Sequence, residues 1–406
     1  MKILFLVPQL PYPLRKGAAI RTYYFLRWLA HAHSVSMLAF AEDGAVPSEL
    51  LDLCAEVRVV PPPARSLSDR LRDVFASPLP DLALRLYSEA YERELLRWLA
   101  EESFDVVQAE SLEMALPWLR AREKAGGGKR PLGVFDDLNA EYLLQWRAFR
   151  TDAGNPRRWA GAAYSAIQTA KLRTFERRLC RDFERVVVVS AEDAAALRAL
   201  RGDFEASVVP NGVDCDYFAF RPPESAAEAS PQVVFTGTMD FRPNVDAVVW
   251  FTRSVFPLVR HELSDARFVV VGNSPAPAVR QLASLPGVEV TGPVPDVRPY
   301  LTASAVYAVP MRIGGGVRLK VLEAMAAGIP VVSTSLGCAG TTAEAGRHFL
   351  RADREDDFAR AVVGVLRREG ALAEMVREAR ELVEARYHWG HLCPLLAAVY
   401  AAGSDE

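Results

Sequence analysis

Residues 306–335, VYAVPMRIGGGVRLKVLEAMAAGIPVVSTS, contain the alternation of elements that decides the fold. The apolar run 306–310 is short enough to predict a buried strand rather than a helix. Three consecutive glycines then predict a turn whose backbone can approach a ligand closely. Good helix formers follow over 317–327, and Gly328 stands where a helix-ending glycine belongs. With a second strand over 330–334, this stretch predicts an α/β fold with a parallel sheet.

The junction between this turn and this helix has the features of an anion site. The turn consists of Gly314, Gly315 and Gly316, and the first amides of a helix have no partner within it. Arg318 and Lys320 lie in the predicted first turn, where positive charge is unfavourable unless an anion compensates it. The pattern therefore predicts that a nucleotide diphosphate binds here. A plain turn before a helix, with Arg318 solvated, is the alternative that the pattern leaves open.

The segment LEAMAAGIPVV (322–332), preceded by a glycine-rich loop, resembles the donor-site signature of retaining glycosyltransferases of family four, which have the GT-B fold. Glu323 lies too far along the helix to share in diphosphate binding, and its carboxylate would suit a ribose diol. The resemblance implies that Glu323 holds the donor ribose and that Arg318 and Lys320 grip the diphosphate. These three residues are therefore the catalytic candidates.

The chain departs from the family pattern within this motif. The family's first glutamate falls at position 315, which is Gly315 here, so a carboxylate contact to the donor sugar is absent or comes from elsewhere. The variants GGGVRLK (314–320) and RPNVDA (242–247) are similar to those of bacterial exopolysaccharide sugar transferases associated with exosortase systems. The resemblance thus implies a role in bacterial polysaccharide or glycoconjugate synthesis.

Length and composition limit the class of protein. A chain of 406 residues is expected to form two domains, and its net charge of −3 gives no support for nucleic-acid binding. Five scattered cysteines show no metal spacing and fit a reducing compartment. No apolar run reaches the roughly 18 residues that predict a membrane span. We expect a cytoplasmic protein with neither a metal nor a bound cofactor.

The order of elements predicts two doubly wound, Rossmann-like sheets, whose ligands bind beyond the carboxyl ends of the strands. We expect residues 1–205 to form an acceptor-side domain and residues 206–385 to form the domain that binds the nucleotide sugar, with a cleft between the sheets. PNGVD (210–214) matches the family's hinge-proximal motif. The resemblance implies that the last helix, 386–406, packs back on the N-terminal domain.

Gly17 stands between the loop after the first predicted strand and the following helix. The resemblance implies that a glycine here lets the backbone approach the donor phosphate or the acceptor, with Arg15, Lys16 and Arg21 as further candidates. A simple turn glycine is the alternative. The GxGxxG fingerprint of dinucleotide-binding proteins is missing from this loop, which argues against an NAD-dependent oxidoreductase.

A polar cluster follows the strand predicted over 132–135. Asp136, Asn139 and Glu141 lie at the carboxyl end of this strand, the edge where parallel sheets bind ligands. They match the family pattern D-x-H-N-x-E, which implies contact with the sugar or the acceptor, although Leu138 takes the position of the histidine. The alternative is that an aspartate in this loop only caps a helix.

Three further residues are candidates for donor binding in the second domain. Gly237 closes a predicted strand on the ligand side of the sheet, and Arg242 lies in the loop where related enzymes carry an Arg/Lys pair for the diphosphate. Val294 belongs to PVPDV (293–297), where the family's backbone meets the nucleobase. The single Arg242 in that loop makes Arg318 and Lys320 the expected replacements for the pair.

Residues 155–185 predict one long helix with an excess of positive charge. A solvated helix face is the plainer interpretation of this charge. The alternative is peripheral contact with the inner face of the membrane, toward a lipid-linked acceptor, because anionic lipids attract basic helices.

The sequence as a whole therefore predicts transfer of a sugar from a nucleotide diphosphate donor to a hydroxyl acceptor, with retention of configuration. The acceptor is a carbohydrate, a lipid-linked molecule or another small molecule. A sugar-nucleotide epimerase and a catalytically silent sugar-nucleotide-binding protein are the alternatives, because the first glutamate and the loop histidine are missing.

Overall fold

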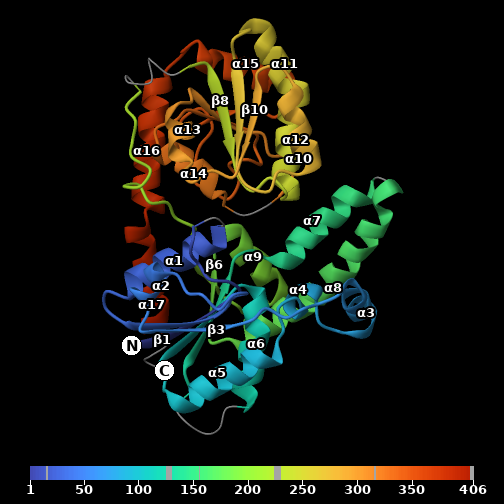
Figure 1. Cartoon of the computed structure of the whole chain (residues 1–406), viewed down its shortest axis with the longest axis vertical. Coiled ribbons are helices and arrows are strands. Elements are labelled where there is room, and N and C mark those ends of the chain that lie inside the picture. The colour runs from blue at the N-terminus through green and yellow to red at the C-terminus, as the bar shows by residue number, and fades with distance from the viewer. Residues whose placement is uncertain (15–16, 125–129, 155, 224–229, 315–316, 403–406) are drawn as a thin grey trace. The chain divides into compact units, whose positions relative to one another are not determined.

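The computed structural model describes residues 1–14, 17–124, 130–154, 156–223, 230–314 and 317–402. The chain forms two compact units. The first unit comprises Met1–Pro210 and the chain from Cys393 onward, and the second unit comprises Asn211–Leu392. Each unit is a parallel sheet with helices on both sides (Figure 1).

The first unit contains a seven-stranded parallel sheet in the order β3-β2-β1-β4-β5-β6-β7. Its strands are β1 (Lys2–Val7), β2 (Ser34–Phe40), β3 (Glu56–Val60), β4 (Val106–Glu110), β5 (Leu132–Asp137), β6 (Arg185–Val188) and β7 (Ser207–Val208). The strand order reverses between β1 and β4, which makes the sheet doubly wound, as the alternation of elements predicts. The apolar central strands are buried on both faces, as parallel sheets require.

Helices connect these strands. They are α1 (Gly17–Leu29), α2 (Ser48–Leu51), α3 (Leu67–Ala76), α4 (Asp81–Leu84), α5 (Glu89–Glu101), α6 (Leu112–Lys124), α7 (Glu141–Ala153), α8 (Trp159–Asp182) and α9 (Ala191–Leu200). The long basic helix predicted over 155–185 is α8, preceded by a short 3₁₀ turn at Pro156–Arg158. Helices α7 and α8 form a hairpin that projects from the first unit (Figure 1).

The final helix, α17 (Trp389–Ala401), belongs to the first unit from Cys393 onward. The Tyr400 hydroxyl donates a hydrogen bond to the side-chain oxygen of Gln108 on β4. The Cys393 thiol lies 3.7 Å from the carbonyl oxygen of Tyr24 on α1. One contact therefore joins this helix to β4 of the N-terminal sheet, and the other joins it to α1.

The second unit contains a six-stranded parallel sheet in the order β10-β9-β8-β11-β12-β13. Its strands are β8 (Gln232–Thr236), β9 (Arg267–Val271), β10 (Val288–Gly292), β11 (Val306–Val309), β12 (Val331–Ser333) and β13 (Leu350–Arg351). The helices around it are α10 (Arg242–Trp250), α11 (Phe256–Glu262), α12 (Pro277–Arg280), α13 (Arg298–Thr302), α14 (Leu319–Ala326), α15 (Glu355–Leu366) and α16 (Leu372–Tyr387). A π-helical turn, Phe251–Val255, joins α10 to α11.

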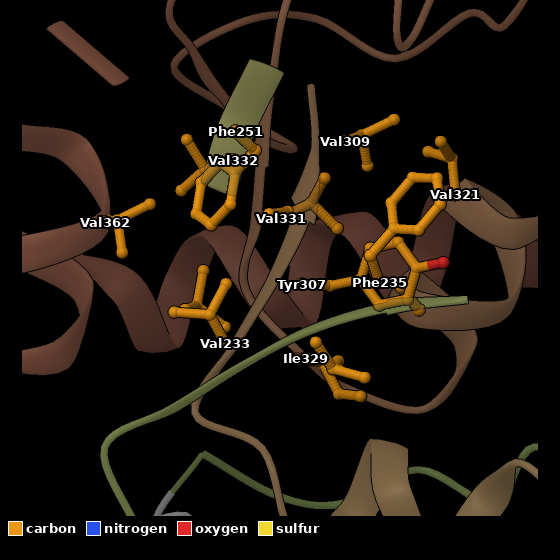
Figure 2. Packing of buried hydrophobic residues seen from close by; sticks show 14 of the residues in the cluster. Val233, Phe235, Phe251, Tyr307, Val309, Val321, Ile329, Val331, Val332 and Val362 are labelled. Atoms are coloured by element: carbon orange, nitrogen blue, oxygen red, sulfur yellow. The ribbon is translucent and has the colours of Figure 1, made fainter. Parts of the chain in front are cut away.

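The core of the second unit fixes α14 against the sheet. Figure 2 shows Phe235 of β8, Tyr307 of β11 and Val321 of α14 among the side chains of this core, and all three are fully buried. The Tyr307 hydroxyl accepts a hydrogen bond of 3.1 Å from the backbone amide of Thr236. This bond joins β11 to the carboxyl end of β8, and the Lys320 ammonium in the first turn of α14 lies over the Phe235 ring of β8.

The stretch that decides the fold forms the predicted elements, with one difference. Strands β11 and β12 confirm the two predicted strands, and Gly328 ends α14 with a φ of +73°. The helix begins at Leu319, two residues later than predicted, because Arg318 keeps an extended backbone (φ −91°, ψ 105°) at the N-cap position. Arg318 therefore precedes the first turn, and Lys320 lies within it.

Two glycines let neighbouring strand ends approach each other. A methyl group added at Gly272, after β9, would lie 1.7 Å from the carbonyl oxygen of Gly237, after β8. We expect Gly272→Ala to lower the free energy of unfolding by about 1–3 kcal/mol, the usual cost of overpacking, because backbone atoms cannot rotate away. Urea unfolding checks this value. Gly154→Ala is the control, since a methyl group there would meet no atom within 4 Å and its φ of −73° suits alanine; a cost as large as that of Gly272→Ala would contradict the steric explanation.

Candidate functional site

Lys320 lies over the carboxyl end of β8. Its ammonium group donates a hydrogen bond of 2.8 Å to the side-chain oxygen of Asn244 on α10 and lies 3.9 Å from the centre of the Phe235 ring. A methyl group added at Gly237 would lie 2.8 Å from the same nitrogen. The amine is therefore confined between a helix N-terminus and the end of a strand, where parallel α/β sheets bind ligands.

The surroundings of Lys320 disfavour its own charge. Burial, followed by the nearby positive charge of Arg318, lowers the pKa of Lys320 to about 7, while Glu323 acts in the opposite direction. An amine with this pKa is partly deprotonated at neutral pH, and a bound anion would restore its charge. The negative charge of Glu323 does not offset the effects of burial and of Arg318 on Lys320, and a diphosphate would supply further negative charge.

Arg318 stands immediately before α14 and is 9% exposed. A methyl group added at Gly314 would lie 3.3 Å from Nη2 of Arg318, so the guanidinium lies close to Gly314. Gly314 has a φ of +116°, a conformation that favours glycine. Arg318, Lys320 and Gly314 therefore lie close together at the N-terminus of α14, whereas Gly315 and Gly316 lie outside the described residues.

Glu323 lies one turn further along α14 and is half-buried. Burial raises the pKa of Glu323 to about 7, and the positive charge of Lys320 opposes this shift. The carboxyl group is thus within electrostatic reach of Lys320 but not in the first turn of the helix. This position suits a partner some distance from the anion that the two cations would hold.

The structure places the other donor-side candidates at the same edge of the sheet. Gly237 follows β8 directly, and Val294 is half-buried in the loop after β10. Arg242 is exposed at the first position of α10. The carboxyl ends of these parallel strands share one edge, where Gly237 lies beside Lys320 and Val294 follows β10, two strands away from β8.

Sequence reasoning missed Asn244. This residue is 7% exposed, its side-chain oxygen accepts from Lys320, and its side-chain nitrogen donates a bond of 2.9 Å to the carbonyl oxygen of Thr238. It positions the lysine and closes the loop after β8. The sequence signal that could have indicated Asn244 is a polar residue on the buried side of the short helix that contains RPNVDA.

Arg21 and Asp136 require a correction. Both side chains are completely buried and form a two-point ion pair, with distances of 2.7 Å from Nε to Oδ2 and 2.9 Å from Nη2 to Oδ1. Arg21 also donates to the carbonyl oxygens of Val209 and Pro210. The prediction that these two residues contact the sugar or the acceptor is therefore wrong for this structure: each satisfies the other within the first unit.

Asn139 and Glu141 are more accessible than Asp136. Both are half-buried at the start of α7, and the backbone amide of Glu141 donates 2.7 Å to a side-chain oxygen of Glu176. Burial, with the charge of Glu113, raises the pKa of Glu141 to about 7. Gly17 is exposed at the first position of α1, whereas its neighbours Arg15 and Lys16 lie outside the described residues.

The described residues contain neither a candidate metal site nor a candidate membrane span. Within them, no group of three or more histidine, cysteine, aspartate or glutamate side chains could hold a metal ion. None of the helices formed by these residues is long and apolar enough to cross a membrane.

Comparisons with known families match most of the chain. Residues 15–217 match the family model described as Glycosyltransferase Family 4, and residues 230–368 match the model described as Glycosyl transferases group 1. The first of these matches covers half of the chain, and the second contains the glycine turn and α14.

Curated relatives match at modest identity. A Klebsiella pneumoniae protein described as an uncharacterized 44.6 kDa protein in the cps region is 25% identical over 163 residues, 38% of this chain and 42% of that protein. A Mycobacterium tuberculosis GDP-mannose-dependent alpha-(1-6)-phosphatidylinositol monomannoside mannosyltransferase is 32% identical over 214 residues, 47% of this chain and 54% of the relative. The chain thus spans about half the length of these two relatives. A Mycolicibacterium smegmatis phosphatidyl-myo-inositol mannosyltransferase is 25% identical, with coverage of 89% and 91%.

Solved structures resemble the whole chain. Sucrose-phosphate synthase from Thermosynechococcus elongatus is 16% identical with a TM-score of 0.71, covering 99% of this chain and 98% of that one. Anabaena HepE, in complex with UDP and glucose, is 16% identical with a TM-score of 0.70 and covers 99% of both chains. These likenesses, together with the two parallel sheets, confirm the predicted GT-B fold.

Proposed function

Because this chain belongs to glycosyltransferase family 4, we propose that it transfers a sugar from a nucleotide diphosphate donor to a hydroxyl acceptor with retention of anomeric configuration. The observation that carries this proposal is the pair of cations, Arg318 and Lys320, at the N-terminus of α14. The pair lies close to Gly314 and the end of β8, and the pKa of the lysine is depressed to about 7.

The chemistry of the leaving group explains the pair. When the bond between the sugar and the diphosphate breaks, negative charge develops on the diphosphate oxygen. Arg318, Lys320 and the first amides of α14 are fixed donors aimed at this region, and such preorganised electrostatics are a large term in catalysis. This arrangement supplies positive charge from side chains and backbone, so the proposed reaction requires no metal and no bound cofactor.

The ribose, the nucleobase and the backbone contacts of the phosphates are assigned to residues by their positions in the second unit. Glu323 accepts hydrogen bonds from the ribose hydroxyls, the backbone around Val294 meets the nucleobase, and Gly237 and Gly314 allow the backbone to approach the phosphates. Arg242 is a further candidate for phosphate contact. Gly17 belongs to the same proposal from the first unit, and so do Gly315 and Gly316.

The acceptor is assigned to the first unit, with Asn139 and Glu141 as candidate contacts. The curated mannosyltransferases are described as acting on phosphatidylinositol compounds, which supports a lipid-linked or carbohydrate acceptor. The relative from the cps region supports a role in bacterial polysaccharide or glycoconjugate synthesis, and the variants of the glycine turn support the exosortase-associated subgroup. We place the protein in the cytoplasm, in peripheral contact with the inner face of the membrane.

The pKa of Lys320 predicts how donor affinity depends on pH. The diphosphate binds the protonated amine better and therefore raises its pKa in the complex. Donor affinity should be highest below the free pKa of about 7 and should fall by up to about tenfold per pH unit above it. Calorimetric titration across this pH range measures the effect. The ligand is a sugar nucleotide, because its diphosphate does not titrate in this range.

Lys320→Met is the matched control for this pH dependence. The variant should bind more weakly and lose the decline above pH 7, whereas a decline that persists would assign the proton to another group. Glu323→Gln removes the opposing effect, since the carboxyl group, with a pKa of about 7, accepts from the ribose more strongly once it is deprotonated. The decline that belongs to Lys320 should therefore be steeper in Glu323→Gln than in the wild type.

The proposed reaction is tested by supplying UDP- and GDP-sugars with carbohydrate and lipid-linked acceptors and following the products by NMR. The expected result is nucleoside diphosphate release coupled to a glycoside with the anomeric configuration of the donor. Conversion of the donor to an epimer without acceptor would replace the proposal with a sugar-nucleotide epimerase. Tight donor binding without turnover on any acceptor would favour a silent binding protein.

A further inference from the structure

Helix α3 exposes a row of large apolar side chains. Leu67, Leu71 and Phe75 are 75%, 65% and 81% exposed, respectively. With 3.6 residues per turn, these three positions lie within roughly 80° of one another around the helix. Single exposed apolar residues are normal on the surface of a soluble protein and need no explanation. A row of them on one helix face indicates a surface that interacts with a protein or a membrane.

This helix is firmly formed in the folded chain. Ser66 and Asp69 make a reciprocal cap at its N-terminus, with both hydrogen bonds at 3.1 Å. At its C-terminus the Lys171 ammonium of α8 donates to the carbonyl oxygens of Asp73 and Val74, at 3.1 Å and 2.7 Å. The exposed row is therefore a rigid feature held beside α8 (Figure 1), not a loose segment that could turn its apolar face inward.

The charges of α3 are sorted around the apolar row. Helical geometry places Arg70 on one flank of the row and Arg72 on the other, with side chains 49% and 68% exposed. Asp69 and Asp73 lie on the opposite side of the helix, where Arg65 binds Asp73 at 2.9 Å. An apolar face flanked by arginines, with the carboxylates behind it, is the pattern of a helix that lies in a membrane interface.

A basic cavity adjoins the C-terminal end of α3. It has a volume of about 630 Å³ and is lined by Pro78 and Leu79, by residues of α8 and by the residue after α9. The α8 residues are Thr174, Phe175, Arg177, Arg178 and Arg181, and the residue after α9 is Arg201. Their carboxylate partners include Asp182, which binds Arg178 and Arg181, and Asp203, which binds Arg201. Arg177 and Arg201 also donate to the carbonyl oxygens of Leu200 and Cys180. Four arginine side chains next to an exposed apolar helix would suit a membrane, which has an apolar interior and anionic phosphates at its surface.

We infer that Leu67, Leu71 and Phe75 of α3 insert into the interfacial region of a membrane that contains anionic phospholipid, with the adjoining arginines contacting the lipid phosphates. From the sequence, membrane contact was an alternative to a solvated face for the basic helix α8 alone. The structure instead gives α8 the electrostatic part and α3 the apolar part. A second copy of this chain fits the surface less well, because three side chains on a short helix offer far less area than a stable protein interface of about 1,200–2,000 Å².

This inference rests on the proposed peripheral contact and not on the sugar-transfer reaction. Attraction to anionic lipid alone weakens with salt, whereas buried apolar side chains keep a protein bound. The row on α3 therefore predicts membrane binding that persists at salt concentrations at which a purely basic helix would dissociate.

Vesicle sedimentation tests the surface directly, with the full-length chain and vesicles of phosphatidylcholine with and without phosphatidylglycerol. We expect the wild type to bind the anionic vesicles. The triple variant Leu67→Ser/Leu71→Ser/Phe75→Ser should bind at least about tenfold more weakly, because three apolar side chains no longer leave water. The matched control, Leu51→Ser/Leu258→Ser/Leu395→Ser, removes three exposed leucines elsewhere and should bind as the wild type does.

A fluorescent label reports insertion itself. All five cysteines are buried, so a single Leu71→Cys substitution can be labelled selectively with an environment-sensitive fluorophore. The emission should shift to the blue on anionic vesicles, while the same label at Leu51→Cys should not respond. Equal responses at the two positions would overturn the inference.

The remaining outcomes separate the two proposals. If the wild type does not bind anionic vesicles at all, both the peripheral contact and the role of α3 fail. If it binds and the triple α3 variant binds equally well, only the role of α3 fails. A dimeric wild type that becomes monomeric in the α3 variant without vesicles would show that a second copy covers the row, which also overturns the inference.

Discussion

Replacing Arg21 by methionine should lower the free energy of unfolding by about 3–5 kcal/mol, the cost of leaving one partner of a buried ion pair alone. Both Arg21 and Asp136 are fully buried, and the arginine also satisfies the carbonyl oxygens of Val209 and Pro210. Without Arg21, the Asp136 carboxylate would remain in the core next to Glu110, whose own pKa burial already raises to about 8. Urea unfolding followed by fluorescence measures the change.

The double variant Arg21→Met/Asp136→Leu is the control for this prediction. Removing both charges leaves no unpaired ion, so it should recover much of the stability that the single variant loses. A loss below about 1 kcal/mol for Arg21→Met, the size typical of an exposed pair, would contradict the structural role assigned here. Such a result would reopen the original assignment of these residues to the acceptor site.

The second large effect concerns donor binding. We expect Arg318→Ala to reduce nucleotide affinity by about 1.5–3 kcal/mol, the range for a hydrogen bond to a charged group. The guanidinium lies against Gly314 at the start of α14, where a diphosphate would also meet the helix amides. Adding Lys320→Met should weaken binding further, because both cations act on the same ligand. Calorimetric titration with a nucleoside diphosphate measures both variants.

Arg312→Ala provides the matched control. Arg312 lies six residues before Arg318, is paired with Asp246 at 2.8 Å and is 46% exposed. Its removal should leave nucleotide affinity within about 0.5 kcal/mol of the wild type, as for most surface changes. Equal losses for Arg312→Ala and Arg318→Ala would mean that general positive charge, not the geometry at α14, attracts the nucleotide.

The fold could be predicted because its signals are local. Short apolar runs such as 306–310 and helix formers before Gly328 specify their elements through propensity and turn chemistry. The start of α14 was predicted two residues early, since the extended backbone of Arg318 depends on the turn before it rather than on helix propensity.

The candidate site could be predicted only in part, because it depends on contacts between distant residues. Arg318 and Lys320 became candidates because positive charge is unfavourable at a helix N-terminus, a signal that lies within a few residues of sequence. Arg21 and Asp136 were misassigned, since no local pattern shows that residues 115 positions apart bind each other in the core. Asn244 was missed for the same reason: its partner Lys320 is 76 positions away.

The central claim is that the N-terminus of α14 binds the diphosphate of a nucleotide sugar. The most direct test is a melting-curve screen of the wild-type chain with UDP, GDP, ADP, dTDP and NAD, all at the same concentration. A ligand present at about 100 times its dissociation constant adds about 2.7 kcal/mol of stability. The account predicts that one nucleoside diphosphate raises the melting temperature and that this shift disappears in Arg318→Ala/Lys320→Met. A shift with NAD alone, or an equal shift in that double variant, would contradict it.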